Sequence, residues 1–161
     1  MRRRIIRATL LAVIMLCCFK LTTLADDGGS YIKDEYKEYA LEASEEYGID
    51  YPLILAIIEM ESSGRADAKN GDCVGLMQVS TTYHSGRAKK LGVDINDPRG
   101  NIFTGVDYLS ELAEKYEVGL ALSIYNGNKN AFELDEKGEM SKYAKKVLDR
   151  AYELDRYYYG L

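Results

Sequence analysis

The sequence predicts one all-α domain of ordinary globular size. Between residues 31 and 158, most segments carry apolar residues at the three-to-four-residue spacing of a helix face, and none shows a convincing strand-like alternation. A chain of 161 residues with 47% hydrophobic and 29% charged residues has the composition of a folded protein with one core. Because the chain also has no internal repeat and no long linker, we expect a single helical domain.

The first 25 residues have a different character. They contain four Arg, an apolar stretch from Ala8 to Phe19, and then Thr-Leu-Ala ending at Ala25. This order is typical of a secretory signal peptide cleaved after Ala25, and the apolar stretch is short for a membrane span. An uncleaved anchor is the alternative, because Arg-rich flanks hold such a segment with its N-terminus inside. In both cases we expect a short segment at 26–34 and a domain at 35–158 outside the cytoplasm.

The charge of the chain excludes several classes of partner. Residues 1–25 hold five of the 21 basic residues and no acidic one, which leaves 16 basic against 26 acidic residues, a net charge of −10. A chain this acidic is not expected to bind nucleic acid or anionic lipid, because both need a basic surface. Beyond residue 25, the single His84 and single Cys73 leave too few ligands for a zinc site and no partner for an internal disulfide.

Helices are expected along the whole domain. Residues 31–47 have the apolar spacing of one helix, and Gly48 is suited to end it. Asp50 offers an N-cap and Pro52 a first-turn residue for the next helix, which runs to about Ser63. The later segments are predicted as a loop at 64–75, a weaker helix at 81–92, a turn at 94–98, an amphipathic helix at 98–116, a core helix at 118–126, a polar loop at 127–138 and a last helix at 139–158.

Glu61 stands in an unusual place, at the end of the apolar run of the second helix. At about 100° per residue it projects from the middle of an apolar arc, whereas Glu59 is expected to point toward the polar side. The arc comprises Leu53, Ile54, Ile57, Ile58 and Met60. Burial raises the pKa of a carboxyl group, which suits a general acid of the kind that glycosidases use to protonate a leaving oxygen. From the residues alone, a glutamate that turns out to solvent or pairs with Arg65 or Arg87 is the alternative.

Five motifs follow one another along the chain: "AIIEMESSGRADA", "VGLMQVSTT", "DPRGNIFTGVDYLSEL", "LALSIYNGN" and "YAKKVL". Their order and spacing resemble those of the soluble lytic transglycosylase domain, a lysozyme-like family, over about residues 35–150. The resemblance implies a lysozyme-like helical fold and an exported bacterial enzyme that acts on peptidoglycan glycan strands. Such an enzyme cleaves the β-1,4 bond between N-acetylmuramic acid and N-acetylglucosamine and leaves 1,6-anhydro ends, with no metal and no cofactor.

The same resemblance implies the residues of the site. Glu61 would be the catalytic acid and base. The substrate-binding residues would be Gly75, Met77, Gln78, Tyr125, Asn126, Tyr143 and Asn70. Gly75 would let the backbone approach the ligand, Met77 would give apolar contact, and the Tyr125 hydroxyl would lie near the reacting sugar and the carboxyl group.

Alternatives remain for several of these residues when they are taken without the resemblance. Met77 would then be a core residue, Asn126 a helix C-cap and Tyr143 a packing residue. Asn101 and Gly105 match a segment that is structural in the family, so we do not place them in the site.

Two other functions are open on this sequence. A hydrolytic muramidase on the same fold would need a second carboxylate to activate water, for which Asp67, Asp72 and Asp97 are available. A catalytically idle domain would instead bind cell wall as part of a secretion, conjugation or phage-entry machine, although an active enzyme can also be recruited to such a machine. The domain is expected to act as a monomer.

Overall fold

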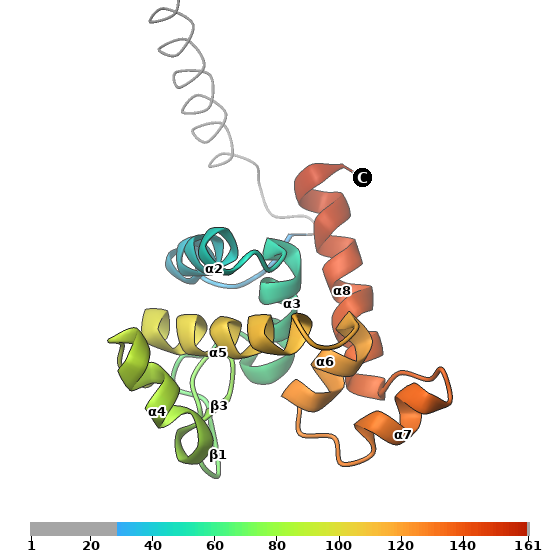
Figure 1. Ribbon diagram of the computed structural model, residues 1–161. Coiled ribbons are helices and arrows are strands. Elements are labelled where there is room, and N and C mark those ends of the chain that lie inside the picture. The colour runs from blue at the N-terminus through green and yellow to red at the C-terminus, as the bar shows by residue number, and fades with distance from the viewer. Residues whose placement is uncertain (1–28, 161) are drawn as a thin grey trace, which may run out of the picture.

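The computed structural model describes residues 29–160 (Figure 1). The expected signal peptide and the first three residues of the 26–34 segment lie outside the described residues. The elements are α2 (Asp34–Tyr47), α3 (Tyr51–Ser62), β1 (Lys69–Asn70), β2 (Cys73–Val74), β3 (Val79–Ser80), α4 (Thr81–Leu91), α5 (Pro98–Ala113), α6 (Val118–Tyr125), α7 (Ala131–Glu136) and α8 (Lys142–Tyr159). The predicted all-α class is confirmed. None of the helices in residues 29–160 has the length and apolar character needed to cross a membrane.

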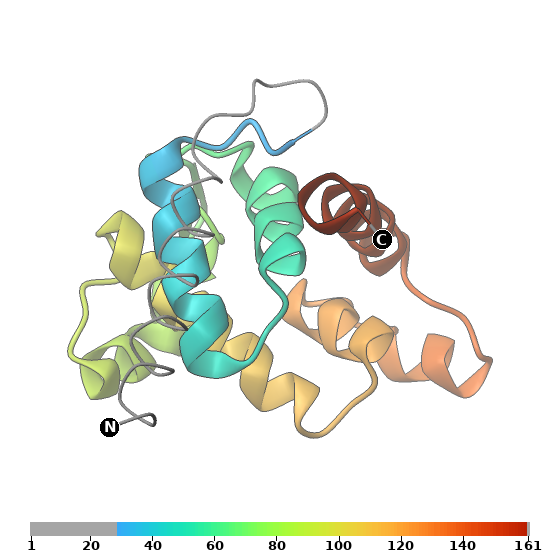
Figure 2. The same cartoon turned by 90° about the horizontal axis from the view of Figure 1, so that it is seen from above.

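The helix α3 lies at the centre of the fold. Seen from above, α2 lies along one side of it and α8 along the other (Figure 2), and both helices pack on it. In the view of Figure 1, α5 runs below α2 and passes in front of α3. Residues 54–58 of α3 are fully buried, including Leu55 and Ala56, which lie outside the predicted apolar arc.

This central position overturns two expectations for α3. Glu59 is 7% exposed rather than on a polar side, because α8 covers that side and Arg150 reaches the carboxylate. Met60, which was expected in the apolar arc, is 38% exposed. An arc drawn on one helix assumes a single solvent face, and α3 has neighbours on both sides.

Two predicted loops contain regular structure. The 64–75 loop holds β1 and β2, which continue into β3 as a small antiparallel sheet of order β1-β2-β3. The polar loop predicted at 127–138 contains the short helix α7, whose only buried residue is Ala131. Strands of two residues are too short to show an alternating pattern, and α7 offers too little apolar surface for its period to be visible.

The ends of the helices follow the capping residues in most places. Gly48 ends α2 in the left-handed conformation at φ 67°, with its N–H donating to the Ser44 carbonyl, as predicted. Asp50 precedes α3, but its side chain makes no capping hydrogen bond. The last predicted helix begins at Lys142 rather than about 139, after the N-cap residue Ser141.

Candidate active site

Glu61 lies in the last turn of α3 and is half-buried. The hydroxyl of Tyr143, in the first turn of α8, donates a hydrogen bond of 2.6 Å to its Oε1 atom. The side chain of Asn126, directly after α6, forms a second hydrogen bond to Glu61. Three helices that are far apart in the sequence therefore meet at one carboxyl group.

The surroundings of Glu61 favour its neutral form. Burial raises its pKa above the ordinary value, and the hydrogen bonds from Tyr143 and Asn126 lower it again in part. Neither of the cations considered as partners reaches it: Arg65 donates to the Ser62 carbonyl, and Arg87 pairs with two carboxylates elsewhere. Burial and the nearby Glu61 charge raise the pKa of Tyr143, so its hydroxyl stays protonated and remains a donor.

The start of α8 is tied to α6 close to this carboxyl. Ser141 caps α8 by accepting a 3.1 Å hydrogen bond from the Ala144 N–H, and its hydroxyl is hydrogen-bonded to that of Ser123 on α6 at 2.8 Å. Both serines are buried. The helix ends that carry Asn126 and Tyr143 are thereby held together.

Tyr125 connects α6 to the loop before β3. Its hydroxyl donates to the Met77 carbonyl at 3.0 Å, so its hydrogen bond goes to the loop backbone and not to Glu61. Burial, followed by the charge of Glu61, raises the pKa of Tyr125. The residue is thus electrostatically coupled to Glu61 while its hydroxyl holds the loop.

The Gly75–Gln78 loop is held by Asn101 of α5. The Asn101 side chain accepts from the Met77 N–H at 2.9 Å and donates to the carbonyls of Val74 and Ile95. Gly75 has φ +76°, and a Cβ there would lie 2.5 Å from the Asn101 side chain. Glycine is therefore required at this position by Asn101 and by the backbone conformation, which differs from the ligand-based reason we expected.

Gln78 and Met77 of this loop contact the fold itself, whereas Asn70 lies outside the loop. Gln78, at φ 47°, donates from its side chain to the carbonyls of Ala68 and Gly75. Met77 is fully buried, so its side chain has no surface with which to contact a ligand. Asn70 is exposed on β1, opposite Cys73.

The sequence motifs did not indicate the aromatic cluster that lies beside Tyr125. Tyr108 of α5 stacks on the Tyr125 ring with 5.6 Å between centroids, and the His84 ring lies 4.3 Å from the Tyr108 ring. The Arg87 guanidinium lies over Tyr108 at 5.3 Å. The sequence did indicate where Tyr108 lies on its helix, because it follows Gly105 by three residues and so shares the same helix face.

Two of the three carboxylates available to a hydrolase have structural tasks. Asp97 caps α5 by accepting a 3.0 Å hydrogen bond from the Gly100 N–H. Asp72 accepts from the Ser80 hydroxyl, and hydrogen bonds from Ser80 and Thr82 lower its pKa. Asp67 is exposed in the loop after α3.

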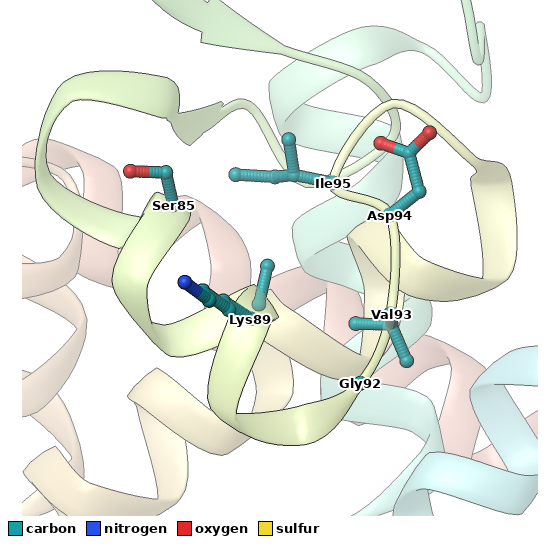
Figure 3. Close-up of a pocket in the computed structure, with 7 residues that line it drawn as sticks. Ser85, Lys89, Gly92, Val93, Asp94 and Ile95 are labelled. Atoms are coloured by element: carbon teal, nitrogen blue, oxygen red, sulfur yellow. The ribbon is translucent and has the colours of Figure 1, made fainter.

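Other features of the surface lie apart from the predicted residues. A shallow pocket between α4 and the loop after it is lined by Ser85, Lys89 and residues 92–95 together with Ala88, and includes no predicted site residue (Figure 3). Within residues 29–160, no group of three or more His, Cys, Asp and Glu side chains is placed to hold a metal ion.

This helical domain, whose central helix ends in a half-buried glutamate held by Tyr143 of α8 and by Asn126 directly after α6, has the lysozyme-like fold. Residues 38–148 match the family model described as the transglycosylase SLT domain, and the chain belongs to this family. The lytic transglycosylase Slt of Pseudomonas aeruginosa, solved as an inactive mutant, shares the fold with a TM-score of 0.63 and 21% identity. That similarity covers 75% of this chain and 24% of the Pseudomonas chain.

Relatives at higher identity are also known. The transglycosylase of Enterobacteria phage PRD1 is 36% identical over 91 residues, covering 55% of this chain and 33% of the phage protein. The membrane-bound lytic murein transglycosylase C of Sodalis glossinidius is 35% identical over 112 residues, covering 58% of this chain and 31% of the relative. The matched region thus spans about a third of the length of these curated relatives.

Proposed function

We propose that the protein is a peptidoglycan lytic transglycosylase that cleaves the β-1,4 bond between N-acetylmuramic acid and N-acetylglucosamine and leaves 1,6-anhydro ends. One observation carries the proposal: Glu61 is desolvated, its pKa is raised, and its carboxyl group is oriented by Tyr143 and Asn126. A carboxyl group with a raised pKa keeps its proton to higher pH than an exposed one, and the two partners fix the direction in which it is delivered. Membership of the transglycosylase SLT domain family supports the choice of substrate.

The reaction needs one carboxyl group in two steps. Protonated Glu61 donates its proton to the glycosidic oxygen, the bond from that oxygen to the anomeric carbon breaks, and the N-acetylglucosamine part leaves with a new hydroxyl. The substrate's N-acetyl group stabilises the positive charge that develops at the anomeric carbon. Ionised Glu61 then takes the proton of the muramoyl C6 hydroxyl, whose oxygen bonds to the anomeric carbon and closes the anhydro ring.

The roles of the surrounding residues follow from their contacts. Tyr143 and Asn126 orient the Glu61 carboxyl and stabilise the ionised form that exists between the two steps. Tyr125 holds the loop carbonyl of Met77 and borders the carboxyl. One side of a glycan groove is formed by Gly75 and Gln78 of the loop together with Asn70 of β1.

Product chemistry tests this function. Purified residues 26–161 incubated with cell-wall sacculi should release muropeptides with anhydro ends, which are lighter by one water and inert to borohydride. Glu61→Gln should lower turnover at least roughly a hundredfold, the scale of losing a general acid, whereas Glu38→Gln on the exposed side of α2 should leave it unchanged. Products that all reduce with borohydride would identify a hydrolytic muramidase. Binding to sacculi without any soluble product would identify an idle cell-wall-binding domain.

We also propose that the protein works outside the cytoplasm, either free after signal cleavage or held by an uncleaved N-terminal anchor. The names of the relatives include both a membrane-bound murein transglycosylase and a phage transglycosylase, which supports an extracytoplasmic place and agrees with recruitment to a phage, secretion or conjugation machine. N-terminal sequencing of protein recovered from the producing cell should begin at or near Asp26. Full-length protein that starts at Met1 in the membrane fraction would show the anchor instead.

A further inference from the structure

Glu59 is a buried carboxylate that the proposed reaction does not use. It lies two residues before Glu61, and its side chain is 5% exposed. Arg150 of α8 holds it with two hydrogen bonds, from Nε to Oε2 at 2.7 Å and from Nη2 to Oε1 at 3.3 Å. A buried ion pair regains in attraction about what it loses in desolvation, so stability alone is a weak reason for placing one here.

The ion pair joins the same two helices as the hydrogen bond to Glu61. Tyr143 and Arg150 are seven residues apart on α8, which is about two turns, so they share one face of that helix. Tyr143 contacts Glu61 and Arg150 contacts Glu59, which gives the α3–α8 contact two polar links.

The Arg150 guanidinium is itself fixed from several sides. Besides Glu59, it donates to Glu153 on its own helix at 3.0 Å and to the Gly29 carbonyl at 3.3 Å. The rigid, planar Arg150 guanidinium therefore contacts α3, its own helix α8 and the segment before α2. Its hydrogen bonds have defined lengths and directions, so they fix the position of α8 relative to α3 more closely than apolar contacts do.

We propose that Glu59 and Arg150 are positioning residues for Glu61: their ion pair sets the height and rotation of α8 against α3, and so keeps the Tyr143 hydroxyl on the Glu61 carboxyl. This inference rests on the proposed function for its catalytic consequence. Both helices also place apolar residues in the buried core, among them Ile58 of α3 and Val147 and Leu154 of α8, and apolar packing is less directional than a hydrogen bond. A 2.6 Å hydrogen bond does not tolerate small sliding movements, and a shift of about 1 Å in a catalytic group can cost on the order of a hundredfold in rate.

The test uses a variant that keeps the fold. Glu59→Gln combined with Arg150→Met removes both charges together, so no unpaired charge is left buried. Thermal unfolding should show a folded protein with a midpoint close to that of the unchanged chain. Lys145→Met, a charge removal at an exposed position of α8, is the matched control and should match the unchanged chain in every assay.

Two readouts separate positioning from a structural role. The kcat on glycan strands should fall roughly ten- to a hundredfold with little change in KM. A 13C NMR titration of the Glu61 carboxyl should show a raised pKa, because the hydrogen bond from Tyr143 that lowers it is lost. The other groups that face Glu61, namely Asn126, Tyr125 and Cys73, are unchanged in this variant.

A double-mutant cycle then tests the route through Tyr143. Tyr143→Phe should lower kcat in the unchanged chain and have almost no further effect in the Glu59→Gln/Arg150→Met background. An unchanged Glu61 titration and kcat in the folded double variant would overturn the inference, as would a full effect of Tyr143→Phe in that background. An unchanged chain that releases no glycan product would overturn the proposed function instead, and the titration of Glu61 would still decide the positioning role.

Discussion

Gly105→Ala tests the packing around Tyr125, which is coupled to Glu61, and around Met77, whose carbonyl holds the Tyr125 hydroxyl. A Cβ at Gly105 would lie 2.8 Å from the Met77 sulfur, 2.9 Å from the Tyr125 hydroxyl and 3.0 Å from the Met77 Cβ. Ordinary carbon contacts are about 3.5–4.0 Å, so at least one of these groups must move by about half an ångström or more. The Met77 Cβ is attached to a backbone held by Asn101, and the Tyr125 hydroxyl is held by the Met77 carbonyl, so neither can move without breaking a contact.

The expected cost follows from two opposing effects. Alanine in place of glycine within a helix gains about 1 kcal/mol, while overpacking a filled site costs about 1–3 kcal/mol. The net change in the free energy of unfolding is a loss of about 0–2 kcal/mol. Because Tyr125 is electrostatically coupled to Glu61, kcat on glycan strands should fall as well.

Gly86→Ala is the matched control for this change. Gly86 lies inside α4, and a Cβ there meets nothing within 4 Å, so the same substitution should stabilise the protein by about 0.5–1 kcal/mol. The two variants should therefore differ by about 1–3 kcal/mol, or roughly 3–10 °C in thermal midpoint. Thermal and urea unfolding measure this difference, and sacculus digestion measures activity. Equal stabilisation by both alanines, with full activity in Gly105→Ala, would refute the packing described around Gly105.

Three further predictions concern the same region. Tyr143→Phe removes a hydrogen bond that lowers the pKa of Glu61, so the pKa rises and the alkaline limb of the pH profile of kcat/KM should move to higher pH; a shift to lower pH would contradict this. The raised pKa of Glu61 means that its protonation favours the folded state below the ordinary carboxyl pKa, and that this contribution is lost as pH rises through the folded pKa. The thermal midpoint of Glu61→Gln should therefore exceed that of the unchanged chain increasingly from pH 4 to pH 8, and a gap that narrows with rising pH would be the wrong sign. Asn101→Ala leaves buried backbone groups of the Gly75–Gln78 loop without partners and should cost about 3 kcal/mol or more in urea unfolding, against about 0.5 kcal/mol or less for the exposed Asn96→Ala.

Local patterns were sufficient for much of the fold. The apolar run of α3 and the glycine at position 48 are readable within a few residues, and both appear where they were predicted. The apolar neighbours of Glu61 in the sequence also indicated a desolvated carboxyl, which agrees with its raised pKa in the fold.

Contacts between distant segments could not be read in this way. Glu59 pairs with Arg150, which comes 91 residues later. The Tyr125 hydroxyl donates to the Met77 carbonyl, which lies 48 residues earlier. Helical periodicity places a residue on its own helix but does not say which second helix will cover it. The spacing from Gly105 indicated the helix face of Tyr108, but not its contacts with the rings of His84 and Tyr125.

The two glutamates of α3 show what separates a carboxylate that can carry out proton transfer from one that cannot. Both are shielded by α8, so burial by itself does not distinguish them. Glu59 faces a guanidinium, a permanent charge that engages both of its oxygens. Glu61 faces the hydroxyl of Tyr143 and the amide of Asn126, which can stay in contact whether or not the carboxyl holds a proton. Burial raises the pKa of Glu61, and because its partners are neutral, no permanent charge cancels that rise, which suits the acid role in the proposed function.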